Sequence, residues 1–182
     1  MGQSAFSPRT CDELLSISVF PTAIGWIGMA GEGDTLHSLV FGYDSQAEVL
    51  GRFRTEFEGD AEIRDWNPEL RQRLQAFLKG DGNAGFKDVK TVETETTPFA
   101  ARVIAAVRRI PAGKVKSYAE IAAAAGSPKA SRAVGNIMAR NTIPIIIPCH
   151  RVVASGGRLG GYSSPKGLDM KTRLLELEAA LT

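Results

Sequence analysis

The apolar positions in the first quarter of the chain gather in short runs that favour strands over helices. Residues 16–20 and 25–30 form two such runs, and residues 35–43 form a third after the turn signal Gly31-Glu32-Gly33-Asp34. Two strand-like runs on either side of a glycine-containing turn are typical of a hairpin. The second and third runs are therefore predicted to pair with each other.

The next stretches have the spacing of amphipathic helices. Residues 45–57 place apolar side chains on one side, at Val49, Leu50, Phe53 and Phe57. Residues 69–78 follow Asn67 and Pro68, types that are preferred at an N-cap and at the first helical position. Residues 86–97 alternate Val and Thr with charges, so a strand or an extended linker is expected there.

The second half of the chain is more helical. Residues 99–110 form an amphipathic pattern, and Ser117 is a predicted N-cap for a helix over 118–125, with Glu120 at its third position. After Gly126, residues Ser127-Pro128 are expected to start another helix that runs to about residue 140. Two short helices joined by a tight turn indicate a helix-turn-helix.

These elements predict an α+β fold with two domains, a small N-terminal α/β domain over 1–96 and a mainly helical C-terminal domain over 97–182. Residues 1–98 carry 9 Lys and Arg against 16 Asp and Glu, a net charge of −7. Residues 99–182 carry 13 against 4, a net charge of +9. A half with this positive charge suggests that the partner is a polyanion such as nucleic acid. The alternative is a basic surface that is only solvated.

Size and composition argue against a membrane-spanning protein and against a secreted one. With 182 residues and 43% hydrophobic content the chain is long enough for a packed core, and no stretch approaches the roughly 20 apolar residues of a membrane span. Residues 1–10 lack the apolar core of a signal peptide. Reduced thiols are favoured over a Cys11–Cys149 disulfide, because only two cysteines occur and no secretory signal precedes them. A cytoplasmic protein is expected.

Cys149 stands beside His150, one of only two histidines, at the end of an apolar run. The prolines at 144 and 148 bracket residues 145–147, a β-branched stretch that favours burial. A thiol at the end of such a segment, with His150 and Arg151 close by, has the surroundings of a positioned nucleophile. The alternative is an inert core cysteine.

The second helix of the predicted helix-turn-helix has unusually small side chains. They are Ala130, Ser131, Ala133 and Gly135. Glycine within a helix costs about 1 kcal/mol relative to alanine, so Gly135 indicates either close approach to a surface or packing against another helix. Arg132 is the one long side chain among them, which suits insertion into DNA better than a clamp on phosphate.

These motifs together, in this order, resemble the O6-alkylguanine-DNA alkyltransferase family. The residues that carry the resemblance are Arg132-Ala133-Val134-Gly135, Asn141, Pro148-Cys149-His150-Arg151-Val152-Val153, Gly160-Gly161-Tyr162-Ser163 and Leu174-Leu175 with Glu178. It is strong over about 97–179 and weak before that, where the hairpin carries it. It implies a ribonuclease H-like N-terminal sheet and a winged-helix-like helix-turn-helix.

The resemblance also implies roles for these residues. Cys149 corresponds to the acceptor that takes the alkyl group irreversibly, His150 to its general base acting through a water, and Glu178 to the carboxylate that orients the histidine. Asn141 corresponds to the asparagine that holds the active-site turn. Tyr118 corresponds to the tyrosine that rotates the target phosphate and protonates guanine N3.

Further residues correspond to the DNA-binding surface and the substrate pocket. Arg132 matches the finger that fills the space left by a flipped base, and the small residues Ala130, Ser131, Ala133 and Gly135 match the helix in the minor groove. Arg151 is also expected to bind DNA. The predicted pocket residues are Val152, Tyr162 and Ser163. The implied partner is double-stranded DNA with O6-alkylguanine, and we expect a monomer that uses no cofactor and does not turn over.

The sequence departs from the family pattern in one loop and in its metal ligands. The loop after Tyr162 is about two residues longer than the common Ser-Gly-Gly-Leu form, which affects the width of the pocket. Some members carry a structural zinc, but here only His37 and Cys11 lie near ligand positions, so no metal is predicted. Cys149 stands where alkyltransferase-like proteins carry tryptophan, which favours a reactive protein.

Three alternative functions remain open from the sequence alone. A non-catalytic protein that binds alkylated DNA would leave Cys149 unmodified. A cysteine hydrolase that used Cys149, His150 and Glu178 would turn over and would leave the basic half without a role. A transcription factor is disfavoured, because Ala130, Ser131 and Ala133 offer base edges few hydrogen bonds.

Overall fold

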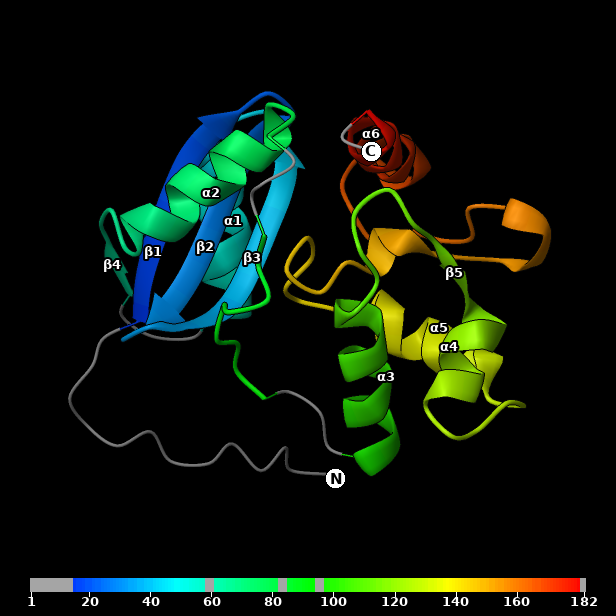
Figure 1. Cartoon of the computed structure of the whole chain (residues 1–182). Coiled ribbons are helices and arrows are strands. Elements are labelled where there is room, and N and C mark those ends of the chain that lie inside the picture. Colours follow the sequence, from blue (N-terminus) through cyan, green and yellow to red (C-terminus); the bar gives the residue numbers. More distant parts are fainter. Residues whose placement is uncertain (1–14, 58–60, 82–84, 94–96, 181–182) are drawn as a thin grey trace.

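The computed structural model describes residues 15–57, 61–81, 85–93 and 97–180. It is a mixed α+β structure in which a small sheet with its helices lies beside a helical half (Figure 1). The sheet contains β1 (Leu15–Thr22), β2 (Gly25–Glu32), β3 (Thr35–Tyr43) and β4 (Ala61–Ile63), in the order β3-β2-β1-β4. The predicted hairpin is confirmed, since β2 and β3 pair antiparallel, whereas β4 pairs parallel to β1.

Helices cover the two faces of the sheet. Helix α1 (Gln46–Glu56) buries Val49 and Phe53 against one face. A Cβ at Gly28 would lie 2.4 Å from both of these side chains, so glycine is required for the helix to approach β2 this closely. Helix α2 (Pro68–Leu78) lies over the other face (Figure 1). Its predicted cap is confirmed, because the Asn67 side chain accepts a hydrogen bond from the Leu70 amide at 3.0 Å.

The segment that joins the two halves is extended rather than a regular strand. A strand or an extended linker was expected for residues 86–97, and the described residues of this range form an extended linker. The main chain on either side of Thr91 pairs with Leu36 of β3: the Leu36 amide donates to the Lys90 carbonyl at 3.0 Å and the Val92 amide to the Leu36 carbonyl at 2.9 Å. This pairing covers part of the free edge of β3, which would otherwise expose unpaired backbone groups.

Over residues 97–180 the helical half contains four α-helices and two short strands. They are α3 (Pro98–Arg108), α4 (Tyr118–Ala124), α5 (Ser131–Ala139), α6 (Gly167–Ala179), β5 (Lys116–Ser117) and β6 (Val152–Val153). Strands β5 and β6 pair in parallel. None of the helices in the described ranges has the length and apolar character required to cross a membrane.

Helices α4 and α5 form the predicted helix-turn-helix, but α5 begins later than expected. The capping box of Ser117 and Glu120 is present at the start of α4. The predicted start of the second helix at Ser127-Pro128 is wrong, because the helix begins at Ser131. The Ser127 amide donates to the Ala122 carbonyl and the Ala130 amide to the Ser127 carbonyl, so these residues complete a turn after α4 instead.

One hydrophobic core is continuous between the sheet and the helical half. The cluster contains Leu39 of β3, Val103 of α3, Val134 of α5 and the buried run 145–147. The Leu39 amide donates to the Thr142 carbonyl at 2.9 Å, so the edge of β3 supports the segment that follows α5. The sheet therefore holds in place the backbone that leads to Cys149.

Candidate active site

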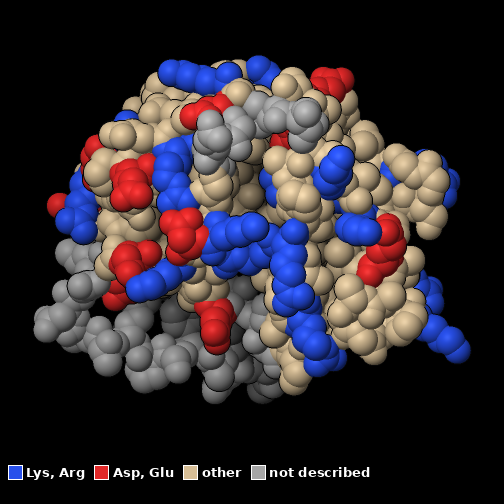
Figure 2. All heavy atoms as spheres, viewed as in Figure 1, with Lys and Arg blue, Asp and Glu red and all other residues tan. Residues whose placement is uncertain are grey.

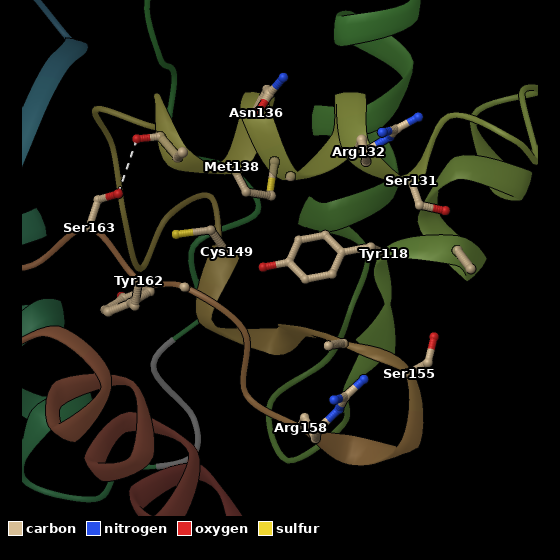
Figure 3. Close-up of a pocket in the computed structure, with 15 residues that line it drawn as sticks. Tyr118, Ser131, Arg132, Asn136, Met138, Cys149, Ser155, Arg158, Tyr162 and Ser163 are labelled. Carbon is tan, nitrogen blue, oxygen red and sulfur yellow. Dashed lines mark hydrogen bonds between the residues drawn. The ribbon is translucent and has the colours of Figure 1, made fainter.

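A pocket of about 670 Å³ lies between α5, the start of α4 and the loops after β6 (Figure 3). Cys149 lies in its wall; its sulfur points away from the Tyr118 ring, whose hydroxyl is directed toward Cys149 (Figure 3). The thiol is free, and Cys149 is only 8% exposed. Cys11, the other member of the disfavoured disulfide, lies outside the described residues.

The backbone before Cys149 is a tight turn that delivers the thiol to the pocket. Ile145 has a φ of +73°, a conformation that a β-branched residue rarely adopts. The Ile147 amide donates to the Ile143 carbonyl at 2.9 Å and closes the turn. Residues Cys149–Arg151 then form one turn of 3-10 helix. Side chains on such a turn diverge, so Cys149 and its neighbour His150 face different surroundings.

The Asn141 side chain fixes this turn from both ends. Its Oδ1 accepts a hydrogen bond from the Ile143 amide at 3.0 Å, and its Nδ2 donates to the Ile147 carbonyl at 2.9 Å. The same Nδ2 lies 3.2 Å from the Cys149 sulfur, to which it also donates. A donor at this position favours the thiolate over the thiol.

His150 and Glu178 form a fully buried pair. The Nε2 of His150 lies 2.7 Å from Oε1 of Glu178. Burial lowers the pKa of His150, so the ring is neutral at physiological pH and its Nε2 donates to the carboxylate. Its Nδ1 is then an acceptor. That nitrogen is buried and has no hydrogen-bond partner among the described residues, which leaves its lone pair open to a proton.

Arg151 completes this buried network. Its Nε lies 3.0 Å from Oε2 of Glu178, its Nη2 lies 2.7 Å from Oε1, and its Nη1 donates to the Ile110 carbonyl at 2.5 Å. Burial alone raises the pKa of Glu178, but the hydrogen bonds from His150 and Arg151 outweigh it and lower that pKa to about 2. The expected DNA contact of Arg151 does not fit this geometry, because its guanidinium is in the interior and occupied by Glu178.

Lys171 was not among the predicted site residues. It is fully buried on α6, where its Nζ donates to the Val152 carbonyl at 2.7 Å and to the Leu159 carbonyl. Burial lowers its pKa, while the nearby Cys149 opposes that shift. The signal was present in the spacing: Lys171, Leu174 and Glu178 recur at intervals of three and four, which places them on one face of a helix.

The pKa of the Cys149 thiol reflects opposing effects. Burial raises it, whereas the hydrogen bond from Asn141, the positive charge of Lys171 and the neighbouring Tyr162 hydroxyl lower it. Burial also raises the pKa values of Tyr118 and Tyr162, and proximity to Cys149 adds to both shifts. Both tyrosines therefore keep their protons at physiological pH.

Tyr118 stands at the first position of α4 and faces the pocket. A Cβ at Gly160 would lie 3.1 Å from its ring and from its hydroxyl, and Gly160 has a φ of +69°. Glycine at this position thus leaves room for the tyrosine ring. Gly135 of α5 is on another side of the same ring, where an added Cβ would lie 4.0 Å away. Gly135 also lines the pocket.

The remaining predicted site residues divide between the pocket and its surroundings. Ser131 and Arg132 line the pocket from α5, whereas Ala133 is exposed on that helix and Ala130 packs against the core. Tyr162 and Ser163 also line the pocket. Val152 is fully buried outside the lining, with its carbonyl bound to Lys171.

The longer loop after Tyr162 is tied to elements on both sides. The Ser163 hydroxyl donates to the Ala139 carbonyl at the end of α5 at 3.2 Å (Figure 3). The Lys166 ammonium forms an ion pair at 2.7 Å with Asp44, which follows β3. The loop is thereby tied to α5 and to the residue that follows β3, and of its residues after Tyr162 Ser163 lines the pocket.

Charge is distributed unevenly over the surface. Figure 2 shows Lys and Arg side chains in a run across the middle of one face, over α3, with most acidic side chains of that view on the sheet side. No group of three or more His, Cys, Asp or Glu among the described residues could hold a metal ion.

Comparison with known proteins supports one family. The family model described as 6-O-methylguanine DNA methyltransferase, DNA binding domain, matches residues 98–180. A methylated-DNA–protein-cysteine methyltransferase of Methanosarcina acetivorans is 38% identical over 164 residues, 90% of this chain and 97% of the relative. That of Mycobacterium leprae is 51% identical over 110 residues, 60% of this chain and 64% of the relative.

Solved structures lead to the same family. The O6-methylguanine methyltransferase of Mycobacterium tuberculosis has a TM-score of 0.74 and 32% identity, over 93% of this chain and 95% of that one. The same organism's OGT in complex with DNA gives 0.74 and 31%, over 92% and 94%. The chain belongs to the methylated-DNA–protein-cysteine methyltransferase family.

Proposed function

We propose that this protein repairs DNA by transferring an alkyl group from O6 of alkylated guanine to Cys149, in a single irreversible turnover. O4-alkylthymine is a second candidate substrate. The observation that carries the proposal is a free cysteine thiol in the wall of a pocket that is open beside a helix-turn-helix, with a buried neutral histidine next to it in sequence. Relatives named as methyltransferases of this kind cover almost the whole chain.

Activation of the thiol is the first step. The Cys149 proton passes to Nδ1 of His150 through a water, because the two side chains diverge from the 3-10 turn. Glu178 holds the ring by its Nε2 and stabilises the imidazolium that results. Asn141 and Lys171 support the negative sulfur. The network of Arg151 keeps Glu178 ionised throughout.

Transfer is the second step. The thiolate attacks the alkyl carbon attached to O6, so a sulfur–carbon bond forms while the carbon–oxygen bond breaks. Guanine leaves with the electron pair, and a proton at N3 makes it a better leaving group. The Tyr118 hydroxyl, protonated and directed into the pocket, is the donor (Figure 3). The proton that His150 took returns to the tyrosinate through solvent, which balances the reaction.

Access to the base is the task of the helix-turn-helix. A base inside a duplex is out of reach of the thiol and must be flipped, at a cost of a few kcal/mol that is smaller for a damaged base. Helix α5 carries small side chains and approaches the minor groove closely. Arg132 enters the stack and fills the space that the base leaves.

We infer a ribonuclease H-like sheet, a winged-helix-like arrangement of α4, α5 and β6, and a domain boundary between residues 96 and 97. The order β3-β2-β1-β4 and the cap of α3 at Thr97 support these assignments. A monomer that acts on duplex DNA in the cytoplasm is our expectation for the working state.

The transfer assay tests the proposal directly. Protein incubated with duplex DNA that contains one O6-methylguanine is expected to gain one methyl group, on the peptide that contains Cys149, and no more than one per molecule. Mass spectrometry of the intact protein and of its peptides is the measurement. An unmodified Cys149 peptide after prolonged incubation would indicate a non-catalytic lesion-binding protein, and turnover of an ester beyond one equivalent would indicate a hydrolase.

Substitution of Arg132 separates base flipping from chemistry. Arg132→Ala is expected to slow transfer from duplex DNA by about 10-fold or more, because part of the energy that keeps the base extruded is lost. Reaction with the free base O6-benzylguanine needs no flipping and is expected to keep its rate. Rates of Cys149 alkylation on both substrates provide the comparison. Arg140→Ala, at the end of the same helix and outside the pocket, is the control; equal losses on both substrates would contradict the finger role.

A further inference from the structure

A loop on the far side of the pocket from α5 presents an arginine that the proposed transfer mechanism does not use. Ser155–Gly157 form a 3-10 turn directly after β6, and Arg158 follows it. Gly156 and Gly157 have φ values of +74° and +76°, which residues with a side chain rarely adopt. The Ala154 amide donates to the Arg158 carbonyl at 2.7 Å and closes the loop.

The interior of the protein holds this loop at both of its stems. Lys171 donates to the Val152 carbonyl before the loop and to the Leu159 carbonyl after it. These bonds are buried or nearly so, and a buried ammonium that has such acceptors is costly to displace. Because Val152 ends the 3-10 turn that begins at Cys149, the same lysine ties the loop to the turn that carries the thiol.

The side chain of Arg158 lies exposed at the rim of the pocket. It lines the pocket from the side opposite Arg132, with the Tyr118 ring between the two (Figure 3). Within the described ranges no hydrogen bond or ion pair engages its guanidinium, in contrast to Arg151 and Arg108. A rigidly presented, unpaired guanidinium beside a pocket of this kind is suited to bind an anion.

We propose that Arg158 binds a backbone phosphate of the strand that carries the flipped nucleotide. This inference rests on the proposed function. When the base enters the pocket, its sugar and phosphates must cross the rim, and the rim carries Arg132 on one side and Arg158 on the other. The guanidinium fork matches two phosphate oxygens. Arg132 therefore acts in the base stack and Arg158 on the backbone, where it adds affinity without base preference.

The salt dependence of DNA binding tests this role. Arg158→Ala is expected to weaken binding of duplex DNA by about 5- to 10-fold and to reduce the slope of log affinity against log salt by about 0.9, the value for one phosphate contact. Arg158→Lys should keep the slope, since the charge remains. Fluorescence anisotropy with a labelled O6-methylguanine duplex measures both quantities, and the rate of alkylation by free O6-benzylguanine should fall less than duplex binding in each variant.

Arg54→Ala provides the matched control. Arg54 is exposed in the last turn of α1, and its replacement removes the same charge far from the pocket rim. The proposal would be overturned if the salt slope of Arg158→Ala equalled that of wild type or of Arg54→Ala. It would also be overturned if the rate of alkylation by free O6-benzylguanine fell as much as duplex binding. Absence of alkylation in the wild-type protein would instead overturn the proposed function, so the two failures are distinguishable.

Discussion

Replacement of Cys149 by serine is expected to abolish alkyl transfer and to leave duplex binding within about 2-fold of wild type. A hydroxyl is far less acidic than a thiol, and neither Asn141 nor the charge of Lys171 is enough to ionise it. Loss of the nucleophile in a serine protease costs a factor on the order of 10⁶. Transfer of a labelled methyl group from an O6-methylguanine duplex measures the first quantity, and anisotropy the second.

The Cys149→Ser variant separates a role of Cys149 in the reaction from a role in the fold. Serine is similar in size to cysteine and accepts the hydrogen bond from Asn141, so the turn before it should persist. A variant that lost both transfer and binding would show that Cys149 supports the fold rather than the reaction. Cys149→Ala serves as a second variant, in which no nucleophile of any kind remains.

Glu178→Gln is expected to lower the free energy of unfolding by about 3–5 kcal/mol at pH 7. The amide preserves the shape of the side chain but leaves the Arg151 guanidinium buried without a counter-charge. It also removes the carboxylate that holds His150, so alkyl transfer should slow by about 10- to 100-fold. Urea unfolding and single-turnover transfer measure the two effects. Glu176→Gln, exposed two residues earlier on the same helix, is the matched control.

The pH dependence of this effect follows from the pKa of Glu178. The folded pKa is about 2 against an ordinary value of 4.5. A depressed carboxyl pKa stabilises the fold above pH 4.5, and that contribution, about 3 kcal/mol, is lost as the pH falls from 4.5 toward 2. The difference between wild type and Glu178→Gln should shrink over that range. A difference that stayed constant from pH 7 to pH 3 would contradict the buried ion pair.

The local elements of this protein follow from its sequence because short-range hydrogen bonds and side-chain spacing determine them. Asn67 caps α2 and Ser117 pairs with Glu120 at the start of α4, as predicted. The hairpin forms where a glycine-rich turn separates two strand-like runs. The predicted start of α5 is three to four residues too early, because Ser127 and Pro128 favour a helix start but the main chain bonds backward onto α4.

The sequence likewise predicted part of the candidate site and missed another part. The position of Cys149 after a proline-bracketed apolar run marks it as a candidate from the sequence alone, since composition and burial preference act along the chain. Arg151 was expected to contact DNA, but its side chain is buried. The neighbouring residues in the sequence do not indicate which charged group a long side chain contacts in the folded chain. The partner of Arg151, Glu178, arrives on α6 from a distant part of the sequence.

The sequence by itself thus determined helices α1 to α4, the hairpin, the charge asymmetry of the two halves and the identity of the candidate nucleophile. Only the tertiary structure decided what surrounds that cysteine. Burial raises the thiol pKa, and contacts between distant elements offset it: Asn141 from the end of α5, Lys171 from α6. Reactivity depends on these distances and on desolvation, which are properties of the packed chain and not of any short segment.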